Sequence, residues 1–286
     1  MPLLVTSASG ANGDGYGALL AFDRQGRALG PFSEDPRIVD PRGLAVDREQ
    51  RLLFVNSGAD RILALDRRGK VVRDSGEIPG LDPGGGVFAP DGRYCVGMRR
   101  ARTVMAFPAT LDGPGQRLLP DRIVPFPRGF AFAADGTRFL ASGIGPGGEG
   151  DNAILAFAPD RDGAPRRLVS DPDLSPLDLM VAPNGNILVS SEHPFGAADA
   201  VTGVREYSSA DGRLVRVFPA GEARAFRRPR GLRFDPGGAL CCVARDEVMA
   251  FDFASARRLG PMVQLTRLNG QALAFFPPEA DTRRDT

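Results

Sequence analysis

The sequence has little excess charge and no long apolar stretch, and each lack excludes a class of protein. Its 286 residues carry 36 Lys and Arg against 35 Asp and Glu. A general nucleic-acid or membrane-surface binder would need an excess of basic residues, so we expect neither as a partner. The N-terminal residues lack the charged start and apolar core of a signal peptide, and no segment is long and apolar enough for a transmembrane helix. We therefore expect a soluble cytoplasmic protein.

Cysteine and helix-forming patterns are also scarce. The cysteines are Cys95, Cys241 and Cys242, an odd number without metal-ligand spacing, and each falls in a strand-like pattern. This favours buried structural thiols over a redox or metal site. Apolar patterns of helical period are missing, whereas 36 Gly and 25 Pro are present. We expect many turns and little helix.

What the sequence does contain is a repeat. Residues 126–143 read as a strand, a tight turn at Asp135-Gly136 and a second strand. Glycine accepts positive φ, Asp bonds its own backbone, and the alternating apolar residues on both sides suit a half-buried sheet. Similar copies begin at Asp40, Asp82, Pro127, Pro176, Pro229 and Asn269.

The copies, of about forty to fifty residues with four strands each, are typical of a β-propeller. The last copy has room for one strand only, but residues 3–6, 18–23 and 28–32 match the missing three. A blade shared by the two chain ends would leave no unpaired edge strand there. The sequence therefore predicts an all-β, six-bladed β-propeller with four antiparallel strands per blade over residues 1–277, followed by a disordered tail at 278–286.

The repeat resembles a known group. The pattern Pro-x-Gly-(apolar)-x-(apolar)-Asp, an apolar strand, and then x-Ile-x-x-(apolar)-Asp-x-x-Gly resembles the NHL-repeat and gluconolactonase/regucalcin-like propellers of the TolB-like superfamily. The resemblance covers nearly all of residues 3–277. It implies an enzyme, either a lactonase-like hydrolase or a lyase. The alternative is a non-catalytic NHL-type propeller that binds a ligand, or a protein partner on one propeller face, because such folds host many functions.

In such a propeller the first strand of each blade lines the central channel. The positions before the small residue of each copy are Arg42, Gly84, Arg128, Leu177, Arg230 and Gln271. Arginines close together repel one another unless they are solvated or share an anion, and their planar forks match carboxylate or phosphate oxygens. The three arginines, with Asp178 and Gln271, are thus candidate residues for binding a small anionic metabolite. Alternatively, each arginine pairs with a carboxylate or carbonyl group of a neighbouring blade.

The resemblance also has an implication for metal binding on the propeller axis. In gluconolactonase-like enzymes, carboxylate and amide side chains hold a divalent cation on the axis. Arg42 stands where that family has Glu, Arg128 where it has Asn, and Leu177 where another oxygen ligand is expected. Arginine opposes a hard cation, which needs several oxygen ligands. We therefore predict no metal ligands and no cofactor, and disfavour calcium, although Asp178 would offer one oxygen.

Three long segments between the second and third strands, residues 7–17, 142–152 and 191–200, are candidate rim loops, where binding and catalysis usually occur. The third holds the single histidine, His193, next to Glu192. An imidazole changes its charge near neutral pH, so His193 and Glu192 are candidate catalytic residues beside arginines that hold a substrate carboxylate. The alternative is a structural or merely exposed histidine.

Overall fold

Turn residues divide the chain into many short strands and leave it without long elements. A computed structural model describes residues 2–9, 15–119, 124–144, 148, 150–159, 164–193, 201–220 and 227–276, without the side chains of His193, Val201 and Thr202. The described residues form 24 strands in six antiparallel four-stranded sheets. None of them forms a helix that would cross a lipid bilayer. The expected tail at 278–286 lies outside the described residues.

Each sheet is one blade, and its strands run from the axis outward. The innermost strands of blades 1 to 6 are β4 (Gly43–Asp47), β8 (Pro83–Phe88), β12 (Pro127–Phe132), β16 (Pro176–Val181), β20 (Leu232–Phe234) and β24 (Gly270–Phe275). The second strands are β5 (Leu52–Ser57), β9 (Tyr94–Met98), β13 (Arg138–Ser142), β17 (Ile187–His193), β21 (Leu240–Val243) and β1 (Leu3–Ser7). The third strands are β6 (Arg61–Leu65), β10 (Thr103–Phe107), β14 (Ala153–Phe157), β18 (Val201–Tyr207), β22 (Glu247–Phe251) and β2 (Ala18–Phe22). The outermost strands are β7 (Val71–Asp74), β11 (Gln116–Arg117), β15 (Arg166–Val169), β19 (Leu214–Phe218), β23 (Arg258–Gln264) and β3 (Ala28–Pro31).

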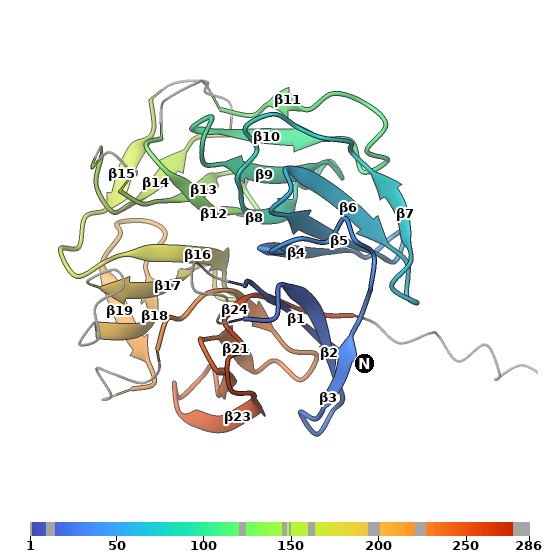
Figure 1. The fold of residues 1–286 in the computed structure, drawn as a ribbon. Coiled ribbons are helices and arrows are strands. Elements are labelled where there is room, and N and C mark those ends of the chain that lie inside the picture. The colour runs from blue at the N-terminus through green and yellow to red at the C-terminus, as the bar shows by residue number, and fades with distance from the viewer. Residues whose placement is uncertain are drawn as a thin grey trace, which may run out of the picture.

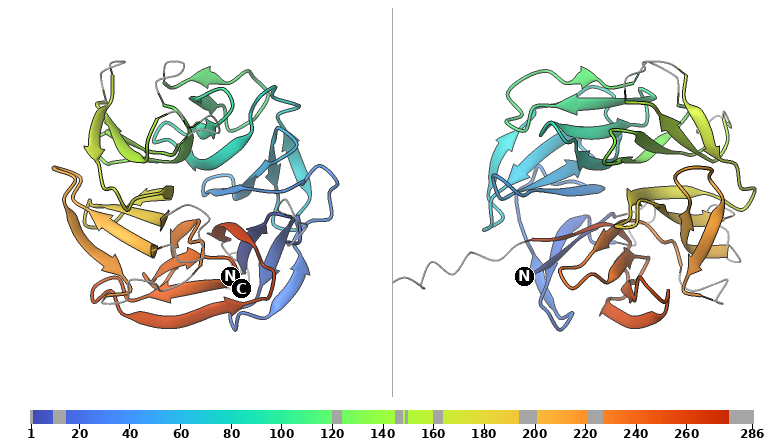
Figure 2. Two further views of the ribbon diagram at one scale, coloured as in Figure 1. Left: turned by 60° about the vertical axis from the view of Figure 1, so that its left-hand side comes forward. Right: turned by 180° about the vertical axis from the view of Figure 1, so that it is seen from behind.

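The innermost strands form a closed ring. Neighbours in the order β24, β4, β8, β12, β16, β20 contact one another, and β20 in turn contacts β24. Figures 1 and 2 show the six sheets arranged around this central axis. The predicted six-bladed propeller is therefore confirmed.

Blade 6 is built from both ends of the chain, as predicted. Strand β24 pairs antiparallel with β1, so that Leu273 lies opposite Val5 and Phe275 opposite Leu3. The Thr6 hydroxyl accepts a hydrogen bond of 2.9 Å from the backbone N–H of Ala272. These contacts close the ring and leave neither strand as a free edge.

The tight turns use the Asp-Gly chemistry that the repeat predicts. In blade 3, Asp135 Oδ1 accepts a hydrogen bond of 2.8 Å from the backbone N–H of Thr137. Gly136 takes φ of 84°, in the left-handed region that favours glycine. The same bond from the residue two positions later recurs at Asp66, Asp91, Asp211 and Asp235.

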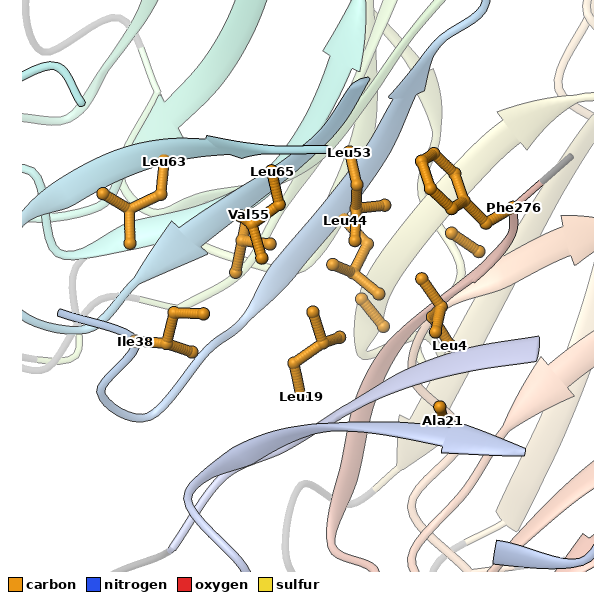
Figure 3. Packing of buried hydrophobic residues seen from close by; sticks show 12 residues of the cluster. Leu4, Leu19, Ala21, Ile38, Leu44, Leu53, Val55, Leu63, Leu65 and Phe276 are labelled. Carbon is orange, nitrogen blue, oxygen red and sulfur yellow. The ribbon is translucent and has the colours of Figure 1, made fainter. Parts of the chain in front are cut away.

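Apolar side chains fill the space between neighbouring blades. Between blades 6 and 1, Leu4 and Leu19 pack with Leu44 and Leu53, and Phe276 completes the layer (Figure 3). Each of these leucines is fully buried, which stabilises the fold by about 1.5–3 kcal/mol per side chain. The sheets are thereby held at fixed positions around the axis.

The predicted buried thiols are confirmed. Cys95, Cys241 and Cys242 are free and buried. Burial raises the pKa of the Cys95 thiol to about 12, so this group stays protonated and unreactive at neutral pH.

β-Bulges interrupt the innermost strands of blades 2, 3 and 4. In each blade the pairing with the second strand shifts after the first residue, so that two residues of the innermost strand oppose one residue of its partner. The bulged residues are 84–85, 128–129 and 177–178. A bulge re-aims side chains, and these three lie where the blades meet at the axis.

Candidate functional site

A cavity of about 600 Å³ lies where the six blades converge. We call it the axial cavity. Every innermost strand, or the residue directly before it, contributes to its lining. All six positions that the repeat places at the axis line it: Arg42, Gly84, Arg128, Leu177, Arg230 and Gln271. Ile144 and Asn152 line it from the segment between the second and third strands of blade 3, so part of one predicted rim loop does reach the cavity.

The lining is strongly basic. It contains five arginines and, as its only carboxylate among the described residues, Asp178. Sequence reasoning missed two of these arginines, Arg99 and Arg233. Arg99 follows β9 directly, where the second strand ends on the same rim, so its position in the repeat gave a usable signal. Arg233 lies inside β20 and is distinguished by no motif.

Arg99 and Arg128 both lie over the aromatic ring of Phe126, at one side of the cavity. Each guanidinium carbon lies 5.4 Å from the ring centroid of Phe126. This is within cation–π distance, which fixes the orientation of both cations. Arg99 also donates a hydrogen bond of 3.1 Å from Nε to the backbone oxygen of Asp82 and pairs with the Asp82 carboxylate.

Arg128 is a largely buried cation that crosses between blades. Its Nη1 donates a hydrogen bond of 2.9 Å to the backbone oxygen of Pro176 in blade 4. Burial, followed by the positive charges of Arg230 and Arg99, lowers the pKa of Arg128 to about 10. The guanidinium lies against Gly143, where a Cβ would be only 2.6 Å from Cζ of Arg128. Glycine at 143 therefore makes room for this side chain.

Arg230 pairs with the predicted catalytic residue Glu192. The Nη2 of Arg230 lies 3.2 Å from Oε2 of Glu192, and Nε of Arg228 lies 3.7 Å from Oε1. Only 3% of the Glu192 side chain is exposed. The pairing that we considered as an alternative for the arginines thus occurs here, between blades 5 and 4.

Asp178 also connects blades 4 and 5. Its Oδ2 accepts a hydrogen bond of 3.0 Å from the backbone N–H of Leu232 and lies 3.3 Å from Nη1 of Arg233. Gly129 of blade 3 packs so closely that a Cβ there would lie 2.9 Å from Oδ1. The carboxylate is held in one orientation at the cavity wall.

Two buried polar atoms of the lining have no hydrogen-bond partner among the described residues. They are Nε of Arg42 and Oγ of Ser175. The backbone N–H groups of both residues are satisfied, by Asn56 O at 2.9 Å and by Ser191 Oγ at 3.0 Å. Buried polar groups are normally hydrogen-bonded, so each unsatisfied atom calls for a bound partner or another explanation. The last predicted binding residue, Gln271, donates from Nε2 to Asn269 O at 3.1 Å.

The other predicted catalytic residue is placed only in part. His193 ends β17, opposite Val201 of β18, and its side chain lies outside the described residues. Within the part of the chain that the structure describes, no three His, Cys, Asp or Glu side chains group as metal ligands would. The axial cavity itself offers a single carboxylate beside five cations, a donor set that does not fit a hard divalent ion.

Comparisons with known proteins give the fold. No family model matches the sequence, and no curated protein matches it. Among solved structures, a chain of the nidogen–laminin complex is 14% identical, with a TM-score of 0.72 over 95% of this chain and 97% of that one. A gluconolactonase from Xanthomonas campestris is 24% identical, with a TM-score of 0.56 over 79% and 78%. A streptogramin B lyase is 14% identical, with a TM-score of 0.56 over 75% of this chain and 66% of the lyase.

These identities are below 25%, so the likeness extends to the fold alone. The matched structures carry different functions under one architecture. The chain is a six-bladed β-propeller structurally similar to a gluconolactonase, a streptogramin B lyase and a chain of the nidogen–laminin complex.

Proposed function

We propose that the axial cavity binds a small anionic metabolite and that the protein acts on it as a hydrolase or a lyase. The observation that carries the proposal is the charge of the lining, with five arginines to one carboxylate. Glu192 and Asp82, which pair with Arg230 and Arg99, do not line the cavity themselves. Arginine forks match carboxylate and phosphate oxygens, so an anion is the ligand that this lining fits.

Repulsion among the arginines supports the same proposal. Burial, and next the charge of Arg42, lower the pKa of Arg99, and burial likewise lowers the pKa of Arg230. The pKa of Arg128 is lowered too, to about 10. In each case the fold disfavours the charged guanidinium relative to water. A bound anion would reverse part of that effect and so would stabilise the folded protein.

The proposal that the protein acts as a hydrolase or a lyase rests on a different observation. Two of the matched structures are named as a gluconolactonase and a lyase. In a lactone hydrolysis, water adds to the ester carbonyl, the ring oxygen leaves and takes up a proton, and the product carries a carboxylate that arginines would hold. His193 remains the candidate for proton transfer. Glu192 is engaged with Arg230, so we assign it the role of positioning that arginine.

A ligand-binding propeller without catalysis is the second candidate. The burial of Glu192 in its ion pair favours it, because that pairing removes one of the two candidate proton-transfer groups. The match to a chain of the nidogen–laminin complex, over 95% of this chain, also lends it support.

A combined binding and turnover experiment distinguishes an enzyme from a ligand-binding propeller without catalysis. Thermal shift and calorimetry with inorganic phosphate and a panel of small carboxylates would be measured on the wild type, Arg42→Met and His193→Ala. Arg27→Met, on an outer turn with 76% of its side chain exposed, is the matched control. Proton release from a panel of lactones and esters of acids that bind reports hydrolysis, and ultraviolet absorbance of the new double bond reports elimination.

We expect anions to raise the Tm of the wild type and the control but not of Arg42→Met. An enzyme would lose turnover in His193→Ala and keep anion binding. Binding without turnover on any compound would favour the non-catalytic propeller. If no anion changes the Tm or gives a binding heat, the anion site is wrong.

A further inference from the structure

Arg233 reaches across the propeller axis. It belongs to β20 of blade 5, and its Nη2 donates a hydrogen bond of 2.9 Å to the backbone oxygen of Leu44 in blade 1. Its Nη1 lies 3.3 Å from Oδ2 of Asp178 in blade 4. Blades 1 and 4 stand on opposite sides of the ring of innermost strands. A single guanidinium that contacts both of them lies at the axis and closes the channel at that level.

This guanidinium forms the floor of the axial cavity. The innermost strands line the cavity with residues near their beginnings, and Arg233 lies further along blade 5 than Arg230. A strand rises about 3.3 Å per residue, so the backbone at Arg233 is up to about 10 Å further from the rim than the backbone at Arg230. Arg42, directly before β4, stands at the rim level in blade 1. The cavity therefore has one cation on its floor and others around its rim.

Arg233 keeps hydrogen-bond donors for a ligand. A guanidinium group has five N–H bonds, and Arg233 uses three of them, toward Leu44 O, Leu232 O and Asp178 Oδ2. Its Nε and one N–H of Nη2 have no acceptor among the described residues. Of this side chain 28% is exposed, and Nε is not one of the buried atoms that lack a partner. A ligand in the cavity, which Arg233 lines, can therefore reach these donors.

Asp178 holds Arg233 in place without using all of its donors. The Oδ1 of Asp178 accepts a hydrogen bond of 2.9 Å from the backbone N–H of Leu179, and its Oδ2 accepts one of 3.0 Å from the backbone N–H of Leu232. These two N–H groups share in stabilising the carboxylate charge, which Arg233 meets only at Oδ2. The arginine can thus bind a second anion from the cavity side.

Arg42 offers similar donors at the rim. Its Nε is buried, but its terminal nitrogens Nη1 and Nη2 are not, and none of the three has a hydrogen-bond partner among the described residues. The lining also includes apolar side chains, among them Phe126 and Leu177, against which methylene groups can pack. The other polar side chains near the rim are Arg99, Arg128, Arg230, Asn152 and Gln271.

The charges around the cavity favour a ligand with two negative charges. In the described part of the chain, three carboxylates lie within ion-pair distance of the five lining arginines, those of Asp82, Asp178 and Glu192. Five positive and three negative charges leave an excess of two. Arg228, which lies 3.7 Å from Glu192, and Asp40, which attracts a lining arginine, add one charge of each sign and leave this excess unchanged.

We propose that the ligand is a short dicarboxylate that binds end-on along the axis. One carboxylate binds Arg233 on the floor, the other binds Arg42 at the rim, and the methylene groups between them pack against Phe126. This inference rests on the proposed function and specifies its ligand. A phosphate group would place both charges at one end of the ligand, whereas the two arginines stand at different depths.

Calorimetry on the full chain with matched acids tests the proposal. Glutarate carries two charges, and its monoamide has nearly the same size and carries one. The straight-chain diacids from malonate to suberate vary the separation of the two carboxylates. The variants are Arg233→Met, the double variant Asp178→Asn with Arg233→Met, and Arg27→Met as the exposed control. The double variant removes both charges of the floor pair, so it tests Arg233 even if the single variant fails to fold.

We expect glutarate to bind the wild type about ten- to a hundredfold more tightly than its monoamide, as hydrogen bonds between a second carboxylate and an arginine would produce. In Arg233→Met the preference is lost or reversed, because the charge of Asp178 remains. In the double variant the two compounds bind equally. The affinity of the wild type for the diacids passes through a maximum with chain length, because the two arginines are a fixed distance apart. Arg27→Met behaves as the wild type.

The outcomes that overturn the proposal are distinct from those that overturn the proposed function. Equal binding of glutarate and its monoamide by the wild type, or a preference that survives in the double variant, removes Arg233 from the site but leaves the anion site. An affinity that shows no maximum with chain length overturns the end-on placement. Tighter binding of inorganic phosphate than of every diacid places both charges in one group. If neither the acids nor inorganic phosphate bind, the anion site itself is lost.

Discussion

Oε2 of Glu192 lies 3.2 Å from Nη2 of Arg230 at the wall of the axial cavity, in a pair of which 3% and 16% of the side chains are exposed. Two charges that have lost most of their water depend on each other. Removing one of them weakens the compensation of the other charge, whereas removing both does not. The pair also joins blade 4 to blade 5, because Glu192 belongs to β17 and Arg230 precedes β20.

A double-mutant cycle at this pair has a definite expected result. Glu192→Leu and Arg230→Met alone should each lower the free energy of unfolding by about 3–5 kcal/mol, because each removes the opposite charge that compensates its buried partner. The double variant Glu192→Leu with Arg230→Met should be within about 1 kcal/mol of the wild type. Urea denaturation followed by circular dichroism measures both. A loss in the double variant equal to the sum of the losses in the two single variants would show that the pair is not coupled.

Removing the charge of Arg42 should stabilise the protein, unlike the removal of Glu192. Its Nε is buried without a hydrogen-bond partner among the described residues, and its charge opposes that of Arg99. We expect Arg42→Met to raise the free energy of unfolding of the ligand-free protein by about 1 kcal/mol. The same variant should no longer respond to anions. A stabilised variant that loses a ligand is the signature of a functional residue, and a destabilised one would contradict this role. The control is Arg27→Met.

Gly143→Ala probes the space that Arg128 occupies. The new Cβ would lie 2.6 Å from Cζ and 2.8 Å from Nη2 of Arg128, at the flexible end of that side chain. The guanidinium should therefore move, and we expect about a tenfold loss of anion affinity with less than about 1 kcal/mol of lost stability. Gly113→Ala is the matched control, because its Cβ would meet Pro108 at an ordinary 3.6 Å. Equal affinities of the two variants would place Arg128 outside the binding site.

Anion binding should depend on pH in the alkaline range. The pKa of Arg128 is lowered to about 10, so its charge is present at neutral pH and is lost as the pH rises through 10. A carboxylate ligand keeps its charge over this whole range. We expect the association constant to be level from pH 7 to 9 and to fall above that, with circular dichroism as the check that the protein stays folded. A level profile up to pH 11 would contradict the role of Arg128.

The fold was predictable because each copy of the repeat shows where a blade begins and which of its strands a segment forms. Turns such as Asp135-Gly136, and the small residue after the "Pro-Arg" position, recur at a spacing that counts the blades. The split blade follows from the same count. Its strand β24 and the N-terminal strands were assigned by matching each to its place in the repeat, and they pair as that matching requires.

The sequence predicts which residues of the innermost strands line the cavity, but not which partners they contact. The six axial residues follow from the register, and all of them line the cavity. Which arginine is paired and which is not depends on contacts between blades, such as that of Arg230 with Glu192 and that of Asp178 with Leu232. These partners are distant in the sequence and share no motif. The bulges in β8, β12 and β16 could not be predicted either, because an extra residue in a strand leaves no clear pattern in the sequence.

The shared blade has a consequence for the kinetics of folding. The hydrogen bond between Thr6 and Ala272 joins residues 266 positions apart, and the entropy of closing so long a loop is lost before any contact of β24 compensates for it. Blades 1 to 5 each pair strands that are close in sequence and can form without that closure. The ring should therefore close last, and the rate-limiting step of folding should be the docking of β24 beside β1.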